Sequence, residues 1–497
     1  MEIRLERGNG ERAERPVYQQ IADQIRAEVE RGALAEGDRL PPIRELARSL
    51  GVNRDTVGLA YEALAADGVV AARVGRGTFV RGRRPRGGGA ALAEPVLSPM
   101  VERLLDHERN RPRYAGAADA VPLHAVIPDP SLFPVEAFRR AVNRTLGDDG
   151  AALLGYGAPT GHAGLRELLA AHLGGFGVRV GPESVVLSQG ATQGITLALR
   201  LFAEPGDTVA VEEPTYQNVL ASLAGLGLRP LAVPMRGEGP DLDALDRALA
   251  RPDVKLFYTI PTFHNPMGTS TSLDHRRELL GVAERRGKPV LEDAFEADLR
   301  ISGRPVPPLA ALDESGLVVQ LLSFSKSLFP GVRAGAVVAR GRLVEALHAL
   351  KHATDLSGAL PLQAALADFL RSGAYERHLA GLRSRVRKRR DAMLAALEES
   401  MPEGTIWTRP EGGYQIWVEL PEPLDTRELL AEAARAGVLF APGYQFHLDG
   451  RPSTGLRLSY SAADEAAIRR GVALLGEVAT ARLASGPPVA RVAAVNV

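Results

Sequence analysis

One lysine in this chain lies among residues that suit a reactive amine. The segment SFSKSLFPGVR, residues 323–333, places Lys326 between two serines and ends in Arg333. Arginine supplies nearly all of the other positive charge, because the only lysines are Lys255, Lys288, Lys326, Lys351 and Lys388. A lysine amine attacks carbonyl carbons after losing its proton, which arginine cannot do at neutral pH. The segment favours a nucleophile at position 326, although a polar surface loop would carry similar residues.

The neighbours of this lysine indicate what it would attack. Ser323 and Ser325 offer hydroxyl donors, and Arg333 follows the turn residues Pro330 and Gly331 with a planar guanidinium that suits a phosphate. These residue types together predict a ligand that carries both an aldehyde and a phosphate.

The elements that would position these residues are strands alternating with helices. Beyond about residue 120, apolar runs separated by helical patterns read SVVLSQ, DTVAVEE, KLFYTIP, KPVLEDA and LVVQLLSFSK. Such strands predict an α/β domain with a mainly parallel sheet between helices. Ligands of these sheets bind at the carboxyl ends of the strands, so the residues that follow each run become candidates.

Those candidates form an ordered set. The segment SQGATQG, 188–194, opens a helix whose N–H groups and Thr192 would bind phosphate. Tyr216, Asn265 and Asp293 follow the next three runs and supply an aromatic ring, an amide and an acid. Each has an ordinary alternative role, as a core residue, a turn residue or a helix cap. Together with Lys326 they match the requirements of pyridoxal 5'-phosphate.

From about residue 122 to 475, these motifs resemble the fold type I aminotransferase family. The resemblance implies that Lys326 is the catalytic Schiff-base lysine, Asp293 the partner of the pyridinium nitrogen, Asn265 a donor to the ring hydroxyl and Tyr216 the stacking ring. It further implies phosphate ligands at Ala191, Thr192, Ser323, Ser325 and Arg333.

The same resemblance implies two more binding residues and reveals two departures. Tyr156, in YGAPTGHAGLRE, is similar to a tyrosine that reaches the phosphate of the neighbouring subunit, and Arg457, in GLRLSYS, to the arginine that binds a substrate carboxylate. The family usually has a tyrosine two or three residues after the aspartate, where this chain has Phe295 and Glu296. Val126 also stands where glycine is usual, so carboxylate binding by the backbone there is less expected.

The N-terminal part has a different pattern. From Arg39 to Arg86 it holds ten arginines and four acidic residues, a surplus that fits a phosphate-facing surface or a solvated charged face. The sequence predicts helix, turn and helix, with Asn53 capping a helix from about 54 to 66, followed by a two-stranded wing around 75–77. In such modules the second helix enters the major groove, which places Arg54, Asp55 and Thr56 at base edges and Arg44, Arg73 and Arg76 at phosphates.

Residues 16–80 resemble the GntR family of winged helix-turn-helix domains, on the segments RELARSLGVNRDTVGLAYEALAADG and RVGRGTFV. Joined to an aminotransferase-like domain, they resemble the MocR family of bacterial transcriptional regulators. That resemblance implies duplex DNA as a partner and a head-to-tail homodimer. We expect a DNA-binding domain at 1–80, a flexible linker at 81–118, a pyridoxal-phosphate-binding domain with a smaller C-terminal α+β subdomain at 119–480, and a disordered tail at 481–497.

Composition limits the remaining possibilities. The chain of 497 residues has no cysteine and equal numbers of acidic and basic residues, so we expect no disulfide framework, no cysteine metal cluster and no generic polyanion binder. We predict no metal site. The charged N-terminus and the lack of a long apolar run predict a cytoplasmic protein with no membrane span.

Three functions fit these features. The first is a regulator that senses an amine or amino acid through a Schiff base, with weak or no turnover. The second is an active aminotransferase that carries a DNA-binding domain. The third is a regulator that senses pyridoxal phosphate itself.

Overall fold

A computed structural model describes residues 16–31, 33–35, 37–73, 77–81, 96–112, 114, 119–237 and 239–485. The chain divides into two compact units, Met1–Val96 and Leu97–Val497. Each unit has a hydrophobic core of its own.

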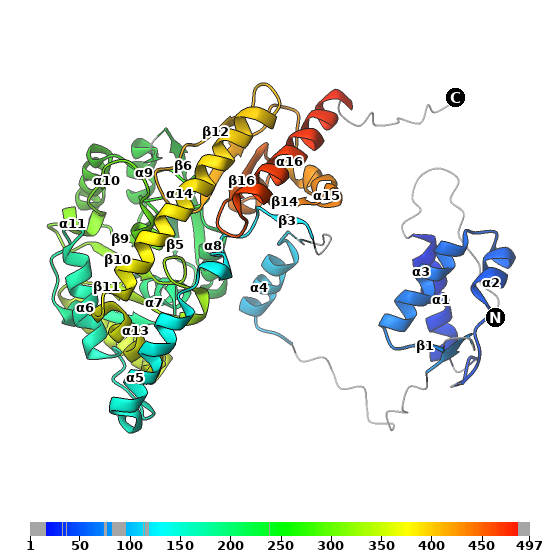
Figure 1. The fold of residues 1–497 in the computed structure, drawn as a ribbon, viewed down its shortest axis with the longest axis horizontal. Helices are drawn as coiled ribbons and strands as arrows, with labels where there is room; N and C mark the ends of the chain where they lie inside the picture. The colour runs from blue at the N-terminus through cyan, green and yellow to red at the C-terminus, as the bar shows by residue number, and fades with distance from the viewer. Residues whose placement is uncertain are drawn as a thin grey trace. The chain divides into compact units, whose positions relative to one another are not determined.

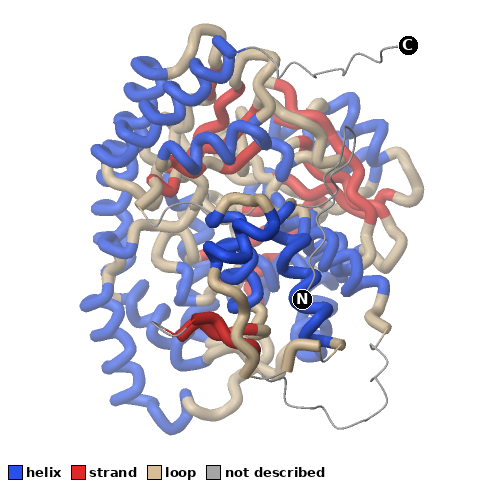
Figure 2. Tube along the Cα trace, turned by 90° about the vertical axis from the view of Figure 1, so that its right-hand side faces the viewer, coloured by secondary structure: helices blue, strands red, loops and turns tan. Residues whose placement is uncertain are grey.

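Over its described residues, the N-terminal unit is a winged helix-turn-helix of three helices and one hairpin. Gly51 ends the second helix in the left-handed conformation, with φ of 64°, and the Asn53 side chain caps the third helix by accepting from the Asp55 N–H at 3.3 Å. Figure 2 distinguishes the strands of the hairpin (red) from the helices (blue). The predicted module is confirmed, with elements α1 (Val17–Glu30), α2 (Ile43–Leu50), α3 (Arg54–Ala66), β1 (Val70–Arg73) and β2 (Gly77–Val80).

The described strands of the larger unit form an eight-stranded sheet that is parallel over its central strands. The neighbours β10, β9, β8, β5 and β6 run parallel, while β11, β4 and β7 add antiparallel pairs at the two sides. In sheet order the strands are β4 (Val185–Ser188), β11 (Gly335–Val338), β10 (Val318–Ser323), β9 (Val290–Asp293), β8 (Val254–Thr259), β5 (Thr208–Glu213), β6 (Arg229–Arg236) and β7 (Gly239–Pro240).

Helices cover both faces of this sheet, as the apolar runs predict. Val290 packs in one hydrophobic core and its neighbour Leu291 in another, because successive side chains of a strand point to opposite faces. The covering helices are α5 (Val135–Leu153), α6 (Ala163–Gly174), α7 (Ala191–Phe202), α8 (Gln217–Leu226), α9 (Leu242–Leu249), α10 (Leu273–Arg286), α11 (Leu309–Leu312), α12 (Arg342–Thr354) and α13 (Leu360–Arg371).

A smaller α+β subdomain follows at the C-terminal end. The long helix α14 (Ala374–Ser400) leads from the large-sheet region to it (Figure 1). Its antiparallel sheet has the order β12 (Ile406–Trp407), β13 (Gln415–Glu419), β16 (Gly455–Ser459) and β15 (Ala441–Pro442). The short strand β3 (Val121–Pro122) joins this subdomain by pairing with β14 (Val438–Leu439), and α15 (Thr426–Ala436) and α16 (Glu465–Ser485) pack beside them.

The prediction of a flexible linker at 81–118 is wrong for one segment. Helix α4 (Pro99–Arg109) lies within it and packs against α8, where Arg103 Nε donates to the Ala224 carbonyl at 3.3 Å. Ser98 caps α4 and Pro99 occupies its first turn, a start signal that the surrounding glycine and proline obscured. Residues 82–95, 113 and 115–118 lie outside the described ranges.

The predicted tail also begins too early, since α16 continues to Ser485. Residues 486–497 lie outside the description. Among the helices that the structure describes, none is long and apolar enough to cross a membrane.

Candidate functional site

Lys326 lies in the turn that follows β10 and faces a segment from the start of the large unit. Its Nζ donates a hydrogen bond to the backbone oxygen of Val126, and the Tyr414 hydroxyl donates to the Lys326 carbonyl at 2.8 Å. Burial lowers the pKa of the Lys326 amine below its ordinary value. The amine is therefore neutral, and nucleophilic, at a lower pH than that of a surface lysine.

Arg457, on β16, and Asn265, after β8, meet at the same place. Arg457 Nη1 donates to Asn265 Oδ1 at 2.8 Å, and Nη2 donates to the His124 carbonyl at 2.8 Å. Both side chains are buried, and Arg457 Nε has no hydrogen-bond partner among the described residues. These bonds of Arg457 reach an amide and a backbone oxygen and no carboxylate, so a carboxylate on a ligand would supply its missing counter-charge.

Asp293, at the end of β9, keeps one oxygen available. It is 1% exposed, and its Oδ2 accepts a hydrogen bond from the Tyr258 hydroxyl at 2.8 Å. Oδ1 is buried and has no hydrogen-bond partner among the described residues. Burial raises the pKa of Asp293 from 3.8 to about 6. A buried carboxylate with a vacant oxygen fits the protonated nitrogen of a pyridine ring.

Tyr216 provides the flat wall expected of a stacking ring. It precedes α8, and its ring lies parallel to that of Phe295, with 6.4 Å between centroids and 5° between planes. The Asn218 amide donates to the Tyr216 hydroxyl at 2.7 Å. Phe295 itself has no polar atom that could bind a ring hydroxyl.

The residues predicted to bind phosphate lie at neighbouring strand ends. Gly335 of β11 pairs with both Ser188 of β4 and Ser323 of β10, which places these two ends at one edge of the sheet. Helix α7 begins there with Ala191 and Thr192 and has no side-chain cap, so its first N–H groups face outward as an anion site would require.

Arg333 reaches the same edge. Its Nη2 donates to the Gln189 carbonyl at 2.9 Å, and a Cβ added to Gly190 would lie 2.9 Å from that nitrogen. Glycine at 190 thus permits the close approach of the guanidinium. Nearby, Ser323 Oγ accepts from the Ser325 N–H at 3.3 Å. The helix end, the hydroxyls and the guanidinium together fit a phosphate.

Tyr156 is the predicted cofactor residue that this chain does not bring to the others. The Tyr156 side chain is 86% exposed, and that of Leu154, two residues earlier, is 77% exposed. A tyrosine that reaches into a second subunit would be exposed in a single chain.

Sequence reasoning missed several contacts at the site. Tyr258 stands within the apolar run KLFYTIP, Glu296 marks only the lack of a phenol, and no motif singles out Gln415. Gln415 donates to Glu296 at 3.1 Å from a position 119 residues away, a pairing that local patterns do not reveal.

Four of the predicted DNA-binding residues have described side chains and lie on the second and third helices. Arg54 and Asp55 are exposed in the first turn of α3, Thr56 is partly exposed, and Arg44 is exposed on α2. Arg73 ends β1. The Arg73 side chain and all of Arg76 lie outside the described residues.

Comparison with known protein families divides the chain as the fold does. Residues 127–475 match the family described as aminotransferase class I and II. Residues 17–80 match the bacterial regulatory proteins of the GntR family.

Individual relatives match either the whole chain or its large unit. A probable rhizopine catabolism regulatory protein MocR from Rhizobium meliloti is 30% identical, over 95% of this chain and 96% of the relative. The 2-aminoadipate transaminase of Thermus thermophilus is 36% identical, over 72% of this chain and 89% of its own.

A solved structure agrees with these relatives. The alpha-aminoadipate aminotransferase LysN from Thermus thermophilus, complexed with N-(5'-phosphopyridoxyl)-L-leucine, is similar with a TM-score of 0.69 and 32% identity. The match covers 78% of this chain and 96% of that one.

Proposed function

Because the chain belongs to the aminotransferase class I and II family and joins that domain to a GntR-type domain, as MocR-type regulators do, we propose that it senses a primary amine or amino acid. The chain is a GntR-type transcriptional regulator with a pyridoxal-phosphate domain. The proposal concerns what that domain detects. In it, Lys326 is the residue that a ligand amine displaces.

The observation that carries this proposal is the bond between Arg457 and Asn265, together with the places of Asn265, Asp293 and Lys326 at or after the ends of the neighbouring parallel strands β8, β9 and β10. Bound pyridoxal phosphate supplies an aldehyde that forms exchangeable covalent links with primary amines. Asp293 would hold the ring nitrogen through its vacant Oδ1, and Arg333 with the start of α7 would hold the phosphate. Arg457 would then orient a ligand that carries a carboxylate.

Tyr156 supports a head-to-tail homodimer within the same proposal. The side chains of Tyr156 and Leu154 are both exposed in the single chain, as they would be if a second subunit covered them. In such a dimer Tyr156 would complete the phosphate site of the partner. Two DNA-binding units would then recognise paired half-sites.

The DNA-binding role rests on α3 of the N-terminal unit. Arg54, Asp55 and Thr56 occupy its first turn, the part of a recognition helix that contacts base edges. Arg44, Arg73 and Arg76 would hold phosphates, which fix the orientation of the domain without reading sequence. Ligand binding in the large domain would change how the two heads engage DNA.

A working aminotransferase remains the second candidate. The retention of Lys326 together with Arg457 supports it as well as the sensor of amino acids. The same arginine disfavours a sensor of pyridoxal phosphate alone, which would need no carboxylate-binding residue. Phe295 favours the sensor over the enzyme, since it supplies no hydrogen bond to a ring hydroxyl.

One titration separates these candidates. Full-length protein with pyridoxal phosphate is mixed with a panel of amines and amino acids, while absorbance and binding to its operator region are followed in parallel. A sensor shows a spectral change and a change in DNA affinity with the same ligand, without release of keto acid. Keto acid release at enzymatic rates with unchanged DNA binding would refute the sensor.

A further inference from the structure

Glu296 is a buried acid near the reactive lysine, and the proposed function gives this acid no role. It lies three residues after Asp293 and is 1% exposed. Its Oε2 accepts from Gln415 Nε2 at 3.1 Å, while Oε1 has no hydrogen-bond partner among the described residues. A buried carboxyl with one oxygen unused is costly, so a further partner is expected for it.

The loop opposite Glu296 is built to approach it closely. Gly413 has φ of 71°, and an added Cβ there would lie 2.5 Å from Glu296 Oε2. Any other residue at 413 would therefore push the loop and the acid apart. The next two residues, Tyr414 and Gln415, supply a backbone N–H and an amide to the same carboxyl.

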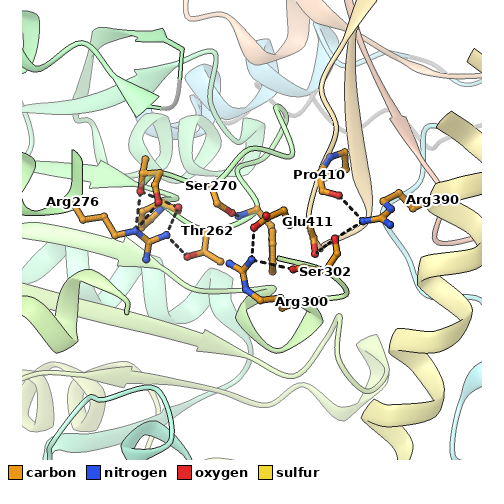
Figure 3. Close-up of polar contacts among 11 residues, drawn as sticks. Thr262, Ser270, Arg276, Arg300, Ser302, Arg390, Pro410 and Glu411 are labelled. Atoms are coloured by element: carbon orange, nitrogen blue, oxygen red, sulfur yellow. Dashed lines mark hydrogen bonds and ion pairs between the residues drawn. The ribbon is translucent and has the colours of Figure 1, made fainter. Parts of the chain in front are cut away.

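Two arginines fix this loop against the large domain from opposite sides (Figure 3). Arg300 Nη1 donates to Glu411 Oε2 at 2.6 Å, and Arg390 Nη1, from α14, donates to the Pro410 carbonyl at 3.0 Å. The Ile301 N–H also donates to the Glu411 carbonyl at 2.9 Å. The loop thus holds Glu296 in one position.

The charged groups that face Glu296 are mainly positive. Lys326, after β10, and Arg457, on β16, act on its charge, and Tyr414 and Tyr460 of the small subdomain are near enough to feel it. Neither cation forms a direct ion pair with Glu296 in the described structure. The lysine and the acid are thus near enough to feel each other's charge, and each lacks a fixed counter-ion.

We propose that Glu296 is a positioning residue for Lys326, whose negative charge favours the protonated form of the amine. Tyr414 donates to the Lys326 carbonyl and the next residue, Gln415, donates to Glu296, so one short segment holds both residues. This gives the chain an acidic partner for its lysine at the place where the family resemblance implies a phenol. The proposal rests on the proposed function only in taking Lys326 as the reactive amine.

The electrostatics agree with this geometry. Burial raises the pKa of Glu296 and lowers the pKa of Lys326, so their titration ranges approach each other. The negative charge of Glu296 raises the pKa of Lys326 in turn. Groups that interact in this way titrate as a pair.

The first test is a spectral pH titration of the full-length protein with pyridoxal phosphate bound. The variant Glu296→Gln keeps the shape and removes the charge, so we expect the midpoint of the visible band to fall by about 1 pH unit. Asp313→Asn is the matched control: Asp313 is also buried, but it bonds to the Gly316 and Val318 N–H groups instead. Its midpoint should stay at the wild-type value.

A second variant tests the proposal if Glu296→Gln does not fold. Gln415→Leu leaves the acid in place but removes its donor, which makes the ionised form less stable and should lower the midpoint by a smaller amount. Thermal melting reports whether each variant folds. An unchanged midpoint in both folded variants would overturn the proposal.

A second measurement is independent of the cofactor. Trace acetylation of the lysines in the cofactor-free full-length protein, mapped by mass spectrometry across pH, gives the titration of Lys326 directly, with exposed Lys388 as internal reference. Glu296→Gln should shift the Lys326 profile to lower pH and leave that of Lys388 unchanged. A protein that binds no pyridoxal phosphate would refute the proposed function, and this profile would still decide the role of Glu296.

Discussion

The guanidinium of Arg457 donates to the side-chain oxygen of Asn265 at 2.8 Å, across 192 residues of sequence. This bond links the residue expected to bind a ligand carboxylate with the residue expected to bind the cofactor ring. It also joins β16 of the small subdomain to the loop after β8 of the large sheet. A carboxylate that binds Arg457 would therefore act on the cofactor pocket through one shared hydrogen bond.

Replacing Lys326 should abolish covalent attachment of pyridoxal phosphate. We expect borohydride to fix the cofactor to wild-type protein at Lys326 and to leave Lys326→Ala unlabelled, because an alanine has no amine to attack the aldehyde. Lys388→Ala, which changes an exposed lysine of α14, is the control and should label normally. Peptide mapping that finds the label at Lys255, Lys288, Lys351 or Lys388 would contradict the assignment.

Replacing Arg457 should separate amino acids from simple amines. Arg457→Leu removes the cation that would pair with a carboxylate. Loss of a charged hydrogen bond costs ~1.5–3 kcal/mol, which corresponds to about a 10- to 150-fold weaker response to amino acids. Amines without a carboxylate should be affected much less. Arg435→Leu, on the exposed side of α15, provides the comparison. The measurement is the spectral titration, and equal losses for both ligand classes would rule out carboxylate recognition by Arg457.

Asp293 should make the folding stability of the cofactor-free protein depend on pH. Its pKa is raised from 3.8 to about 6 in the folded state, so its proton stabilises the fold below pH ~4 and this contribution is lost as pH rises through about 6. A shift of about two units corresponds to ~3 kcal/mol. Denaturant unfolding across this range should show a steeper loss of stability in wild type than in Asp293→Asn.

Adding pyridoxal phosphate supplies the control for that experiment. A protonated ring nitrogen beside Asp293 stabilises the carboxylate, so the bound protein should lose less stability over the same pH range. Identical pH profiles for wild type and Asp293→Asn, with and without cofactor, would show that Asp293 does not carry this effect.

Arg54 and Arg44 should affect DNA binding differently. If Arg54 contacts a base edge, as we propose, Arg54→Ala removes a contact worth ~1–3 kcal/mol and should reduce the ratio of specific to random DNA binding. Arg44→Ala should weaken both alike and lower the salt dependence, because a phosphate contact carries no sequence information. Binding isotherms at several salt concentrations give both quantities. An equal loss of affinity for specific and random DNA in Arg54→Ala would show that Arg54 does not contact base edges.

Transamination should be slow even where ligand exchange is fast. Phe295 provides no hydrogen bond to a ring hydroxyl. Lys326 bonds to the backbone oxygen of Val126, which stands where the related family usually has glycine at its carboxylate-binding backbone. We therefore expect exchange with amino acids but keto acid release well below ~1 s⁻¹, the lower end of usual enzyme rates. A single-turnover experiment measures both steps. Rapid and complete keto acid release would favour the aminotransferase.

The sequence by itself determined the elements and the residues at their ends. The apolar runs of β4, β5, β8, β9 and β10 are local patterns, and the candidate polar residues stand at the end of a run or within a few residues of it, as with Asp293 at the end of β9. The helix-turn-helix was equally local, since Gly51 and Asn53 mark its turn within a few residues. Neighbouring residues decide such features, because periodicity, caps and turns depend on short stretches of chain.

Only the tertiary structure decided which side chains share the site. Helix α4 had a start signal at Ser98, but its packing against α8 depends on residues more than a hundred positions away, such as Ala224. The pairing of Glu296 with Gln415, and the approach of Gly413, arise where the small subdomain closes on the large one. Close packing between segments that are far apart in the chain creates these contacts. A single sequence has no local pattern from which they could be predicted.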